Sequence, residues 1–418
     1  MGLNDTPSAE RVHIGVFGRT NAGKSSIFNQ LVNQDAAVVS DIRGTTTDPV
    51  MKAMELLPIG PVVMIDTPGL DDTGELGEKR IIKAKEILRR IDIALLVIDA
   101  KDARTDSFDF TLEKELIGEM RKRGVPYLVI LNKAESLPKK EQGAVMAKTV
   151  RNTGQFDDDD MAASPVILYS TRMESFSADA LRATIASIYK EEERSHRLVS
   201  DLVKPGDTVV LVVPIDESAP KGRLILPQQQ VIRELIEHGA YPLVTKETGL
   251  EEALRLLKEP PALVVTDSQA FGAVAKIVPH TLPLTSFSIL QARYKGDLAA
   301  QAKGARALDT LPEGARILLA EGCTHHRQCK DIGTVKLPGW IEKHTGRSFS
   351  YTFTSGNEFP GDLSQYDLVI HCGGCMLNPR EMRYRISSAA AAGVPVTNYG
   401  VLIAYLHGIL DRVLEPFE

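Results

Sequence analysis

Four cysteines fall into two short clusters whose composition is that of a metal site. Cys372 and Cys375 form a C-x-x-C pair within the run HCGGC, where two glycines let the backbone turn tightly so that both sulfurs can face one centre. Upstream, Cys323 begins the run CTHH, and Cys329 follows it by six residues. Thiolate sulfur and imidazole nitrogen are ligands of zinc and of iron, so we expect these clusters to bind metal.

Strand-like segments precede both clusters. Residues 315–320 and 366–370 are mostly apolar runs, and a helix-like segment at 380–392 follows the second cluster. Ligands in parallel sheets gather at the carboxyl ends of the strands. We therefore expect one metal site, assembled at the carboxyl edge of a sheet.

The residues alone leave the metal and its ligand set open. A structural zinc site usually combines two close pairs of ligands, whereas this set is widely split, so zinc and an iron–sulfur cluster both stay possible. The candidates for a fourth ligand beside Cys323, Cys372 and Cys375 are Cys329, His325, His326, His371 and a distant carboxylate such as Asp216. Three thiolates with one exchangeable ligand would leave an open iron, which binding a second metal unit requires.

A redox dithiol or a buried structural pair is the alternative interpretation of Cys372 and Cys375. A thioredoxin-like dithiol usually opens a helix directly, but residues 376–379 intervene here. The metal site is therefore the favoured interpretation.

A second group of residues has the spacing of a phosphate-binding loop. Residues 18–25 read GRTNAGKS, between a strand-like run at 12–17 and a helix-like run at 26–32. Backbone N–H groups of such a loop, and the helix N-terminus behind it, point at phosphate. Lys24 is expected to reach the β- and γ-phosphates, and Ser25 to bind Mg²⁺.

Further motifs follow in the order that a GTPase requires. Thr46, in the run GTTTD, is the expected switch threonine for Mg²⁺ and the γ-phosphate; Asp66 and Gly69, in DTPG, are expected to hold Mg²⁺ through water and to sense the γ-phosphate. We expect Lys24, Thr46, Asp66 and Gly69 to act in hydrolysis. The residues expected to bind GTP or GDP are Gly18, Asn21, Ala22, Gly23, Lys24, Ser25, Ser26, Thr46, Asp66, Gly69, Asn132, Lys133, Glu135 and Ser170.

Strand-like and helix-like segments alternate along the whole chain. In the first half, strands are expected at residues 62–65, 93–98, 127–131 and 166–169, with helices at 78–90 and 108–123. This alternation predicts an α/β protein with a doubly wound parallel sheet and ligands at the carboxyl ends of its strands.

The first 180 residues or so resemble the TrmE–Era branch of small GTPases. In that family N-K-x-D reads guanine; here Glu135 replaces the aspartate, and Ser170-Thr171-Arg172 replaces S-A-K, so guanine preference is what the resemblance implies. Leu70 stands where Ras-type enzymes place a water-orienting Gln. Asn21 matches the position that coordinates K⁺ in the family, which implies slow, K⁺-stimulated hydrolysis; a plain turn residue is the alternative.

The length and composition of the chain limit the number of domains and the kinds of partner that it can have. At 418 residues we expect roughly three domains, placed at 1–197, 198–280 and 281–418. A net charge of −6 without a basic run argues against nucleic-acid binding, and no apolar stretch is long enough for a membrane span. Few cysteines and no signal-peptide core favour the cytoplasm.

The middle segment is expected to form a homodimer through open strand edges, with a pocket around Asp216 and Arg223 as the alternative.

The pattern C-x-H … H-C-x-x-C, at Cys323, His325, His371, Cys372 and Cys375, resembles the HydF family of [FeFe]-hydrogenase maturation GTPases. The likeness spans essentially the whole chain. It implies that three cysteines bind a [4Fe–4S] cluster, with His325 and His371 as ligands or hydrogen-bond donors. It also implies a scaffold that receives the di-iron subcluster precursor from radical-SAM maturases and delivers it to the apo-hydrogenase. Cys329 lies outside the family motif.

Two other functions fit parts of the sequence. One is a ribosome- or tRNA-associated GTPase with a structural zinc site, against which the acidic balance counts. The other is a redox-regulated GTPase that uses Cys372 and Cys375 as a disulfide switch.

Overall fold

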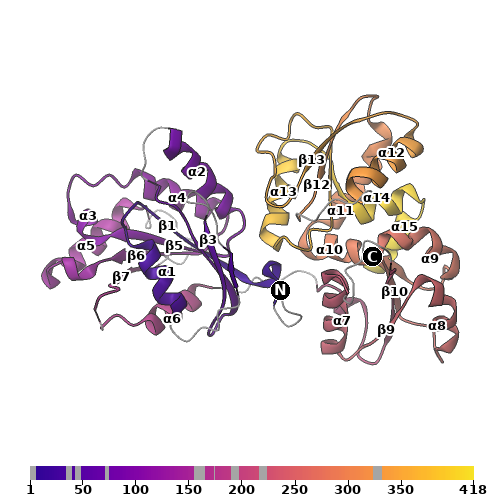
Figure 1. Cartoon of the computed structure of the whole chain (residues 1–418), viewed down its shortest axis with the longest axis horizontal. Coiled ribbons are helices and arrows are strands. Elements are labelled where there is room, and N and C mark those ends of the chain that lie inside the picture. The colour runs from indigo at the N-terminus through magenta and orange to yellow at the C-terminus, as the bar shows by residue number, and fades with distance from the viewer. Residues whose placement is uncertain are drawn as a thin grey trace. The chain divides into compact units, whose positions relative to one another are not determined.

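Three sheets, built mostly of parallel strands, organise the part of the chain that the structure describes. This computed structural model describes residues 6–33, 40–42, 49–70, 75–154, 165–173, 175–189, 197–215, 224–322 and 332–418. The chain divides into two units, Met1–Glu192 and Glu193–Glu418 (Figure 1). The first unit contains one sheet and the second contains two, so the prediction of an α/β fold with a doubly wound N-terminal sheet is confirmed.

The sheet of the first unit has the order β2-β3-β4-β1-β5-β6-β7, with β4 to β7 and β1 parallel and an antiparallel edge at β2 and β3. Its strands are β1 (Val12–Gly18), β2 (Ser40–Ile42), β3 (Val50–Leu56), β4 (Gly60–Asp66), β5 (Ile93–Asp99), β6 (Tyr127–Asn132) and β7 (Val166–Leu168). The antiparallel hairpin of β3 and β4 was not expected from the sequence.

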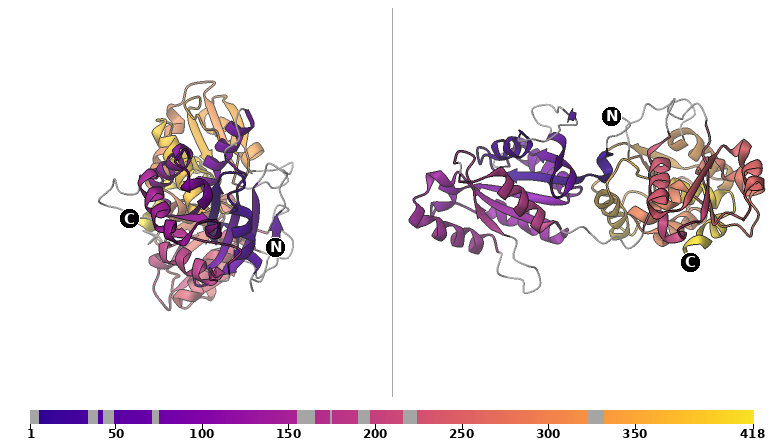
Figure 2. Two further views of the ribbon diagram at one scale, coloured as in Figure 1. Left: turned by 90° about the vertical axis from the view of Figure 1, so that its left-hand side faces the viewer. Right: turned by 90° about the horizontal axis from the view of Figure 1, so that it is seen from below.

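Helices cover both faces of this sheet, as Figure 1 and Figure 2 show. They are α1 (Lys24–Asn33), α2 (Glu75–Leu88), α3 (Ala100–Arg104), α4 (Thr111–Lys122), α5 (Lys139–Asn152) and α6 (Ala178–Ile188). Successive residues of β5 alternate between two cores: Leu95 packs with α1 and α6, and Leu96 packs with α2, α4 and α5. A strand buried on both faces is apolar throughout, which is why these strands read as continuous hydrophobic runs.

The second unit contains two four-stranded parallel sheets. The first has the order β11-β10-β8-β9 and the second β13-β12-β14-β15. Their strands are β8 (Thr208–Val212), β9 (Tyr241–Thr245), β10 (Leu263–Thr266), β11 (Leu284–Ser286), β12 (Arg316–Ala320), β13 (Ser350–Thr354), β14 (Leu368–His371) and β15 (Val396–Asn398).

One hydrophobic core joins these two sheets. It includes Val210 and Val264 from the first sheet and Leu319 and Ile370 from the second. The helices of the unit are α7 (Leu226–His238), α8 (Leu250–Leu256), α9 (Phe271–Ile277), α10 (Phe287–Lys295), α11 (Leu298–Ala307), α12 (Leu337–Thr345), α13 (Pro379–Ala391), α14 (Tyr399–Leu406) and α15 (Leu410–Leu414). Helix α14 is buried from Tyr399 to Ala404, as expected for a helix that is apolar on all sides.

Two details of this unit concern where its elements begin and end. The apolar run 402–413 is divided between α14 and α15, because Gly408 adopts a left-handed φ of 68° between them. Strand β11, at residues 284–286, pairs with β10, and so belongs to the sheet that precedes the proposed boundary at residue 280. The three-domain boundaries themselves stay a prediction. No helix in the described ranges is long and apolar enough to cross a membrane.

Helix α11 lies directly on β15, and Gly304 makes the closest approach. A Cβ added at Gly304 would stand 2.0 Å from the carbonyl oxygen of Val396. We expect Gly304→Ala to lower the free energy of unfolding of this unit by roughly 1–3 kcal/mol, because overpacked backbone has to move. Gly339→Ala in α12, where an added Cβ meets nothing within 4 Å, is the matched control and should be neutral or stabilising. Equal denaturation midpoints for the two variants would contradict the packing described.

Candidate functional site

The loop of residues 18–25 connects β1 to α1 and lies against the ends of β5 and β6. A Cβ on Gly18 would stand 2.2 Å from the Val97 carbonyl oxygen, and one on Gly23 would stand 2.1 Å from Nδ2 of Asn132. Asn21 adopts a left-handed φ of 62°. The close backbone packing explains both glycines, and the loop with α1 has the conformation that cradles phosphate.

Lys24 and Ser25 begin α1, and Asp66 ends strand β4. The Lys24 Nζ donates to the Arg19 carbonyl oxygen at 2.8 Å, and the Ser25 hydroxyl donates to Oδ2 of Asp66 at 2.7 Å. Burial raises the pKa of Asp66, which the Ser25 bond and the Lys24 charge oppose. The other carboxylate oxygen of Asp66 is buried without a hydrogen-bond partner. A hydroxyl beside an unsatisfied carboxylate oxygen fits a Mg²⁺ ion with its waters.

Two residues of the motif that is expected to read the base also contact the phosphate loop. The Asn132 amide donates to the Ala22 carbonyl at 3.0 Å, and Lys133 Nζ donates to the Asn21 carbonyl at 2.6 Å. Lys133 also pairs with Asp99, at 2.7 Å between Nζ and Oδ2. Asp99 was not predicted, although its place directly at the end of β5 could have indicated it.

Of the other residues predicted to bind nucleotide, the structure describes Glu135, Ser170 and Ser26. Glu135 is exposed on a short turn after β6. Ser170 is fully buried, and its hydroxyl accepts from the backbone N–H of Arg172 at 3.1 Å. Ser26 is exposed in the first turn of α1. Thr46 lies outside the described residues, so its role stays a prediction.

Arg19 joins the phosphate loop to α4, a contact that no local pattern predicts. Its guanidinium binds Glu113 through two bonds, of 2.7 Å and 3.0 Å, and lies over the ring of Phe108. Glu113 is 1% exposed. The two residues are 94 positions apart in the chain, so only the folded structure shows the pair.

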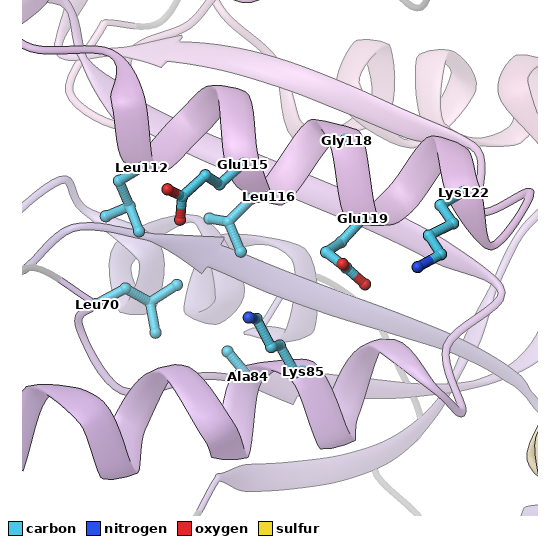
Figure 3. Close-up of a pocket in the computed structure, with 9 residues that line it drawn as sticks. All are labelled: Leu70, Ala84, Lys85, Leu112, Glu115, Leu116, Gly118, Glu119 and Lys122. Atoms are coloured by element: carbon cyan, nitrogen blue, oxygen red, sulfur yellow. The ribbon is translucent and has the colours of Figure 1, made fainter. Parts of the chain in front are cut away.

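Gly69 contacts the phosphate loop at Thr20. A Cβ on Gly69 would stand 2.1 Å from the Thr20 hydroxyl oxygen and 2.8 Å from its backbone nitrogen. The next residue, Leu70, is buried and lines a cavity of ≈ 510 Å³ between α2 and α4 (Figure 3). The position expected to sense the γ-phosphate is therefore followed directly by a residue that lines this cavity.

The first unit thus has the fold and the site of a P-loop GTPase, and comparisons with known proteins agree. Residues 13–133 match a family described as 50S ribosome-binding GTPases. GTPase Der from Kosmotoga olearia is 30% identical over 177 residues, which are 41% of this chain and 37% of that protein. The tRNA modification GTPase MnmE of Mycoplasma mycoides is 35% identical over 136 residues, 32% of this chain and 28% of that protein. The chain therefore spans well under half the length of these relatives.

Among solved structures, Era from Aquifex aeolicus superposes with a TM-score of 0.33 and 18% identity, covering 59% of this chain and 98% of that one.

Two further matches cover the second unit. Residues 198–296 match the hydrogen maturase F dimerization domain, and residues 299–416 match the hydrogen maturase F tetramerization domain. With the GTPase domain before them, these matches extend over most of the chain. The chain belongs to the hydrogen maturase F family.

The cysteine clusters follow two neighbouring strands of the second unit. Strands β12 and β14 pair in parallel, with Ala320 opposite His371. The Gly322 backbone N–H donates to Sγ of Cys372 at 3.0 Å, and a Cβ on Gly322 would stand 3.5 Å from Cα of Gly374. The prediction that both strands end at one edge of one sheet is confirmed. Gly322 directly precedes Cys323, and Gly374 directly precedes Cys375.

Several predicted ligands lie outside the described residues. They are Cys323, His325, His326, Cys329 and Asp216. Within the described ranges no group of three His, Cys, Asp or Glu residues has the arrangement of a metal site. The ligand set that combines Cys323 with Cys372 and Cys375 stays a prediction.

Both described cysteines are free thiols and partly buried. Burial raises the pKa of Cys372 to about 11, against two backbone N–H bonds that lower it. Burial also raises the pKa of Cys375, and the Lys295 charge opposes this. Buried thiols of this kind become thiolates when a cation replaces their protons, so metal binding here would release protons. Soft sulfur donors fit an iron–sulfur cluster or zinc.

His371 is buried, and both of its ring nitrogens are engaged. Nδ1 donates to the Cys372 carbonyl at 2.8 Å, and Nε2 accepts from Arg385 at 3.0 Å. Burial and the Arg385 charge lower the pKa of His371 to about 3, which keeps the ring neutral. To bind a metal through Nε2, His371 would have to displace Arg385, which is itself paired with Glu381.

The close approach of Gly69 to Thr20 can be tested by a substitution in the GTPase domain. Gly69→Ala should push the segment that follows Asp66 away from the phosphate loop and slow GTP hydrolysis by roughly 100-fold. Single-turnover hydrolysis is the measurement, with GDP affinity expected to change little. Gly118→Ala in α4, where an added Cβ meets nothing within 4 Å, should hydrolyse GTP like the wild type. Normal hydrolysis by Gly69→Ala would contradict the contact.

Proposed function

We propose that this chain is a GTP-hydrolysing scaffold of [FeFe]-hydrogenase maturation that binds a [4Fe–4S] cluster through Cys323, Cys372 and Cys375. One observation carries the proposal: the two cysteine clusters follow neighbouring parallel strands, with Gly322 against Gly374. This register brings the segment leading into Cys323 beside the C-x-x-C loop. Membership of the hydrogen maturase F family supports the role in maturation.

The fourth position of the cluster is proposed to be exchangeable. His371 already has a partner at each ring nitrogen, which counts against it as the fourth ligand. His325 stays a candidate for the fourth ligand of the cluster. An exchangeable position would let the scaffold hold a second metal unit, the precursor of the di-iron subcluster, on its way from radical-SAM maturases to the apo-hydrogenase.

Self-association is proposed to occur through the sheet edge at β9. This strand pairs with β8 on one side only, and Tyr241 and Val244 are 64% and 46% exposed. An open edge with exposed apolar side chains is suited to pairing with a second copy. The dimerization-domain match over residues 198–296 supports a homodimer formed by this region.

GTP is proposed to act as a switch, with K⁺ as an activating ion at Asn21. The γ-phosphate would order the segments around Thr46 and Gly69, and those segments would bias partner binding. The open carboxylate oxygen of Asp66 and the hydroxyl of Ser25 support Mg²⁺ binding beside them. We place this cycle in the cytoplasm, without nucleic acid or membrane.

Iron content tests the cluster directly. Anaerobically purified and reconstituted protein should contain about four irons per chain and give a reduced-cluster paramagnetic signal after dithionite. Cys372→Ser should lose both iron and signal, whereas Cys329→Ser should keep them because Cys329 lies outside the family motif. One equivalent of zinc and no iron would contradict the proposal and favour the RNA-associated GTPase. A Cys372–Cys375 disulfide without metal would favour the redox switch.

The role of K⁺ is tested by the Asn21 side chain. Wild-type turnover should be faster in KCl than in NaCl, and Asn21→Gly, which keeps the left-handed backbone but removes the amide, should be slow in both. Equal turnover of the wild type in both salts would contradict the proposal that K⁺ activates hydrolysis. Lys24→Ala serves as the control: it should abolish hydrolysis in either salt and leave the cluster chromophore intact.

A further inference from the structure

We propose that Lys295 is a positioning residue of the cysteine site, which clamps the C-x-x-C loop and adds a buried positive charge beside it. This inference rests on the proposed function, because the loop is taken to hold the cluster. Lys295 ends α10 and is 3% exposed. Its neighbourhood in the chain, KGD, contains no motif that indicates such a role.

The clamp consists of three hydrogen bonds from one ammonium group. Lys295 Nζ donates to the carbonyl oxygens of Gly374 at 2.9 Å, of Cys375 at 3.3 Å and of Leu377 at 2.9 Å. An ammonium has three donors, so this loop can use all of them. The three carbonyls span the second cysteine, and fixing them sets the direction of its Cα–Cβ bond.

A second contact of α10 with the loop lies near the other end of the helix. A Cβ on Gly373 would stand 3.3 Å from the hydroxyl oxygen of Ser288, at the start of α10. The Asn398 amide, at the end of β15, donates to the Ser288 carbonyl at 2.9 Å. Helix α10 therefore contacts the loop at both ends and is tied to the sheet that carries the cysteines.

The clamp crosses the border between two family domains. Lys295 lies in the segment that matches the dimerization domain, and the loop lies in the segment that matches the tetramerization domain. The cysteine site is thus completed by a residue of the preceding domain. A buried ammonium is costly unless an anion or hydrogen bonds compensate its charge. Metal binding turns the neighbouring Cys375 thiol into a thiolate, and this anion would compensate the charge of Lys295.

The charge gives a readout that a purely structural clamp would not change. Reduction adds one negative charge to the cluster, and net charge and hydrogen bonds around a cluster set its potential. Removing a nearby cation should therefore shift the midpoint potential to more negative values. Removing the hydrogen bonds should instead speed the loss of iron, since residues that orient metal ligands typically contribute about 10–100-fold in affinity.

The test uses the full chain, reconstituted anaerobically with iron and sulfide. Lys295→Met removes bonds and charge, and Lys295→Gln removes the charge but keeps two N–H donors. Lys303→Met, at an exposed position of neighbouring α11, is the matched control. The readouts are iron release to a chelator, the midpoint potential of the cluster, circular dichroism and GTP hydrolysis.

We expect Lys295→Met to release iron about 10–100-fold faster than the wild type, and Lys295→Gln to show a more negative potential with slower release than Lys295→Met. Wild-type release by Lys295→Met would overturn the clamp, and a wild-type potential in Lys295→Gln would overturn the role of the charge. If Lys295→Met fails to fold, Lys295→Gln supplies both readouts against Lys303→Met. A wild type that binds no iron would refute the proposed function instead.

Discussion

The parallel pairing of β12 with β14 is the constraint on which the second unit depends. This register sets Ala320 opposite His371, and the chain leaves both strands at one edge of the sheet. The Gly322 N–H then donates to Sγ of Cys372, and a Cβ on Gly322 would stand 3.5 Å from Cα of Gly374. A shift of one residue in this register would turn alternate side chains to the opposite face and separate the two loops.

One hydrophobic core packs the two sheets of this unit together. Valines of the β8–β11 sheet and leucines of the β12–β15 sheet pack in one cluster with α14. This arrangement brings α10 against the cysteine loop, where Lys295 and Ser288 contact it. The nucleotide site is built by the same principle in the first unit, because Asn132 and Lys133 at the end of β6 hold the phosphate loop that follows β1. In each site, side chains from another element hold a loop that follows a strand.

Features that leave a local pattern in the sequence could be predicted from it. Contacts between residues far apart in the chain could not. The run GRTNAGKS and the apolar strands around it identify the phosphate loop because glycine, lysine and burial leave local signals. The three-residue strands β11 and β15 are too short to show a period. Arg19 meets Glu113 across 94 residues, and Lys295 meets Gly374 across 79, so neither pair has a local signature. His371 was named as a candidate ligand, and only the structure shows its bonds to Cys372 and Arg385.

The most direct test of this account is anomalous diffraction from anaerobic crystals of the reconstituted chain, with data at the iron and zinc absorption edges. We expect one iron-cluster peak between the loops after β12 and β14, within bonding distance of Cys323, Cys372 and Cys375. The peak should be strong just above the iron edge, be lost just below it, and gain nothing on crossing the zinc edge. A zinc peak there, or iron bound away from either loop, would contradict the claim that two neighbouring strand ends assemble a single iron–sulfur site.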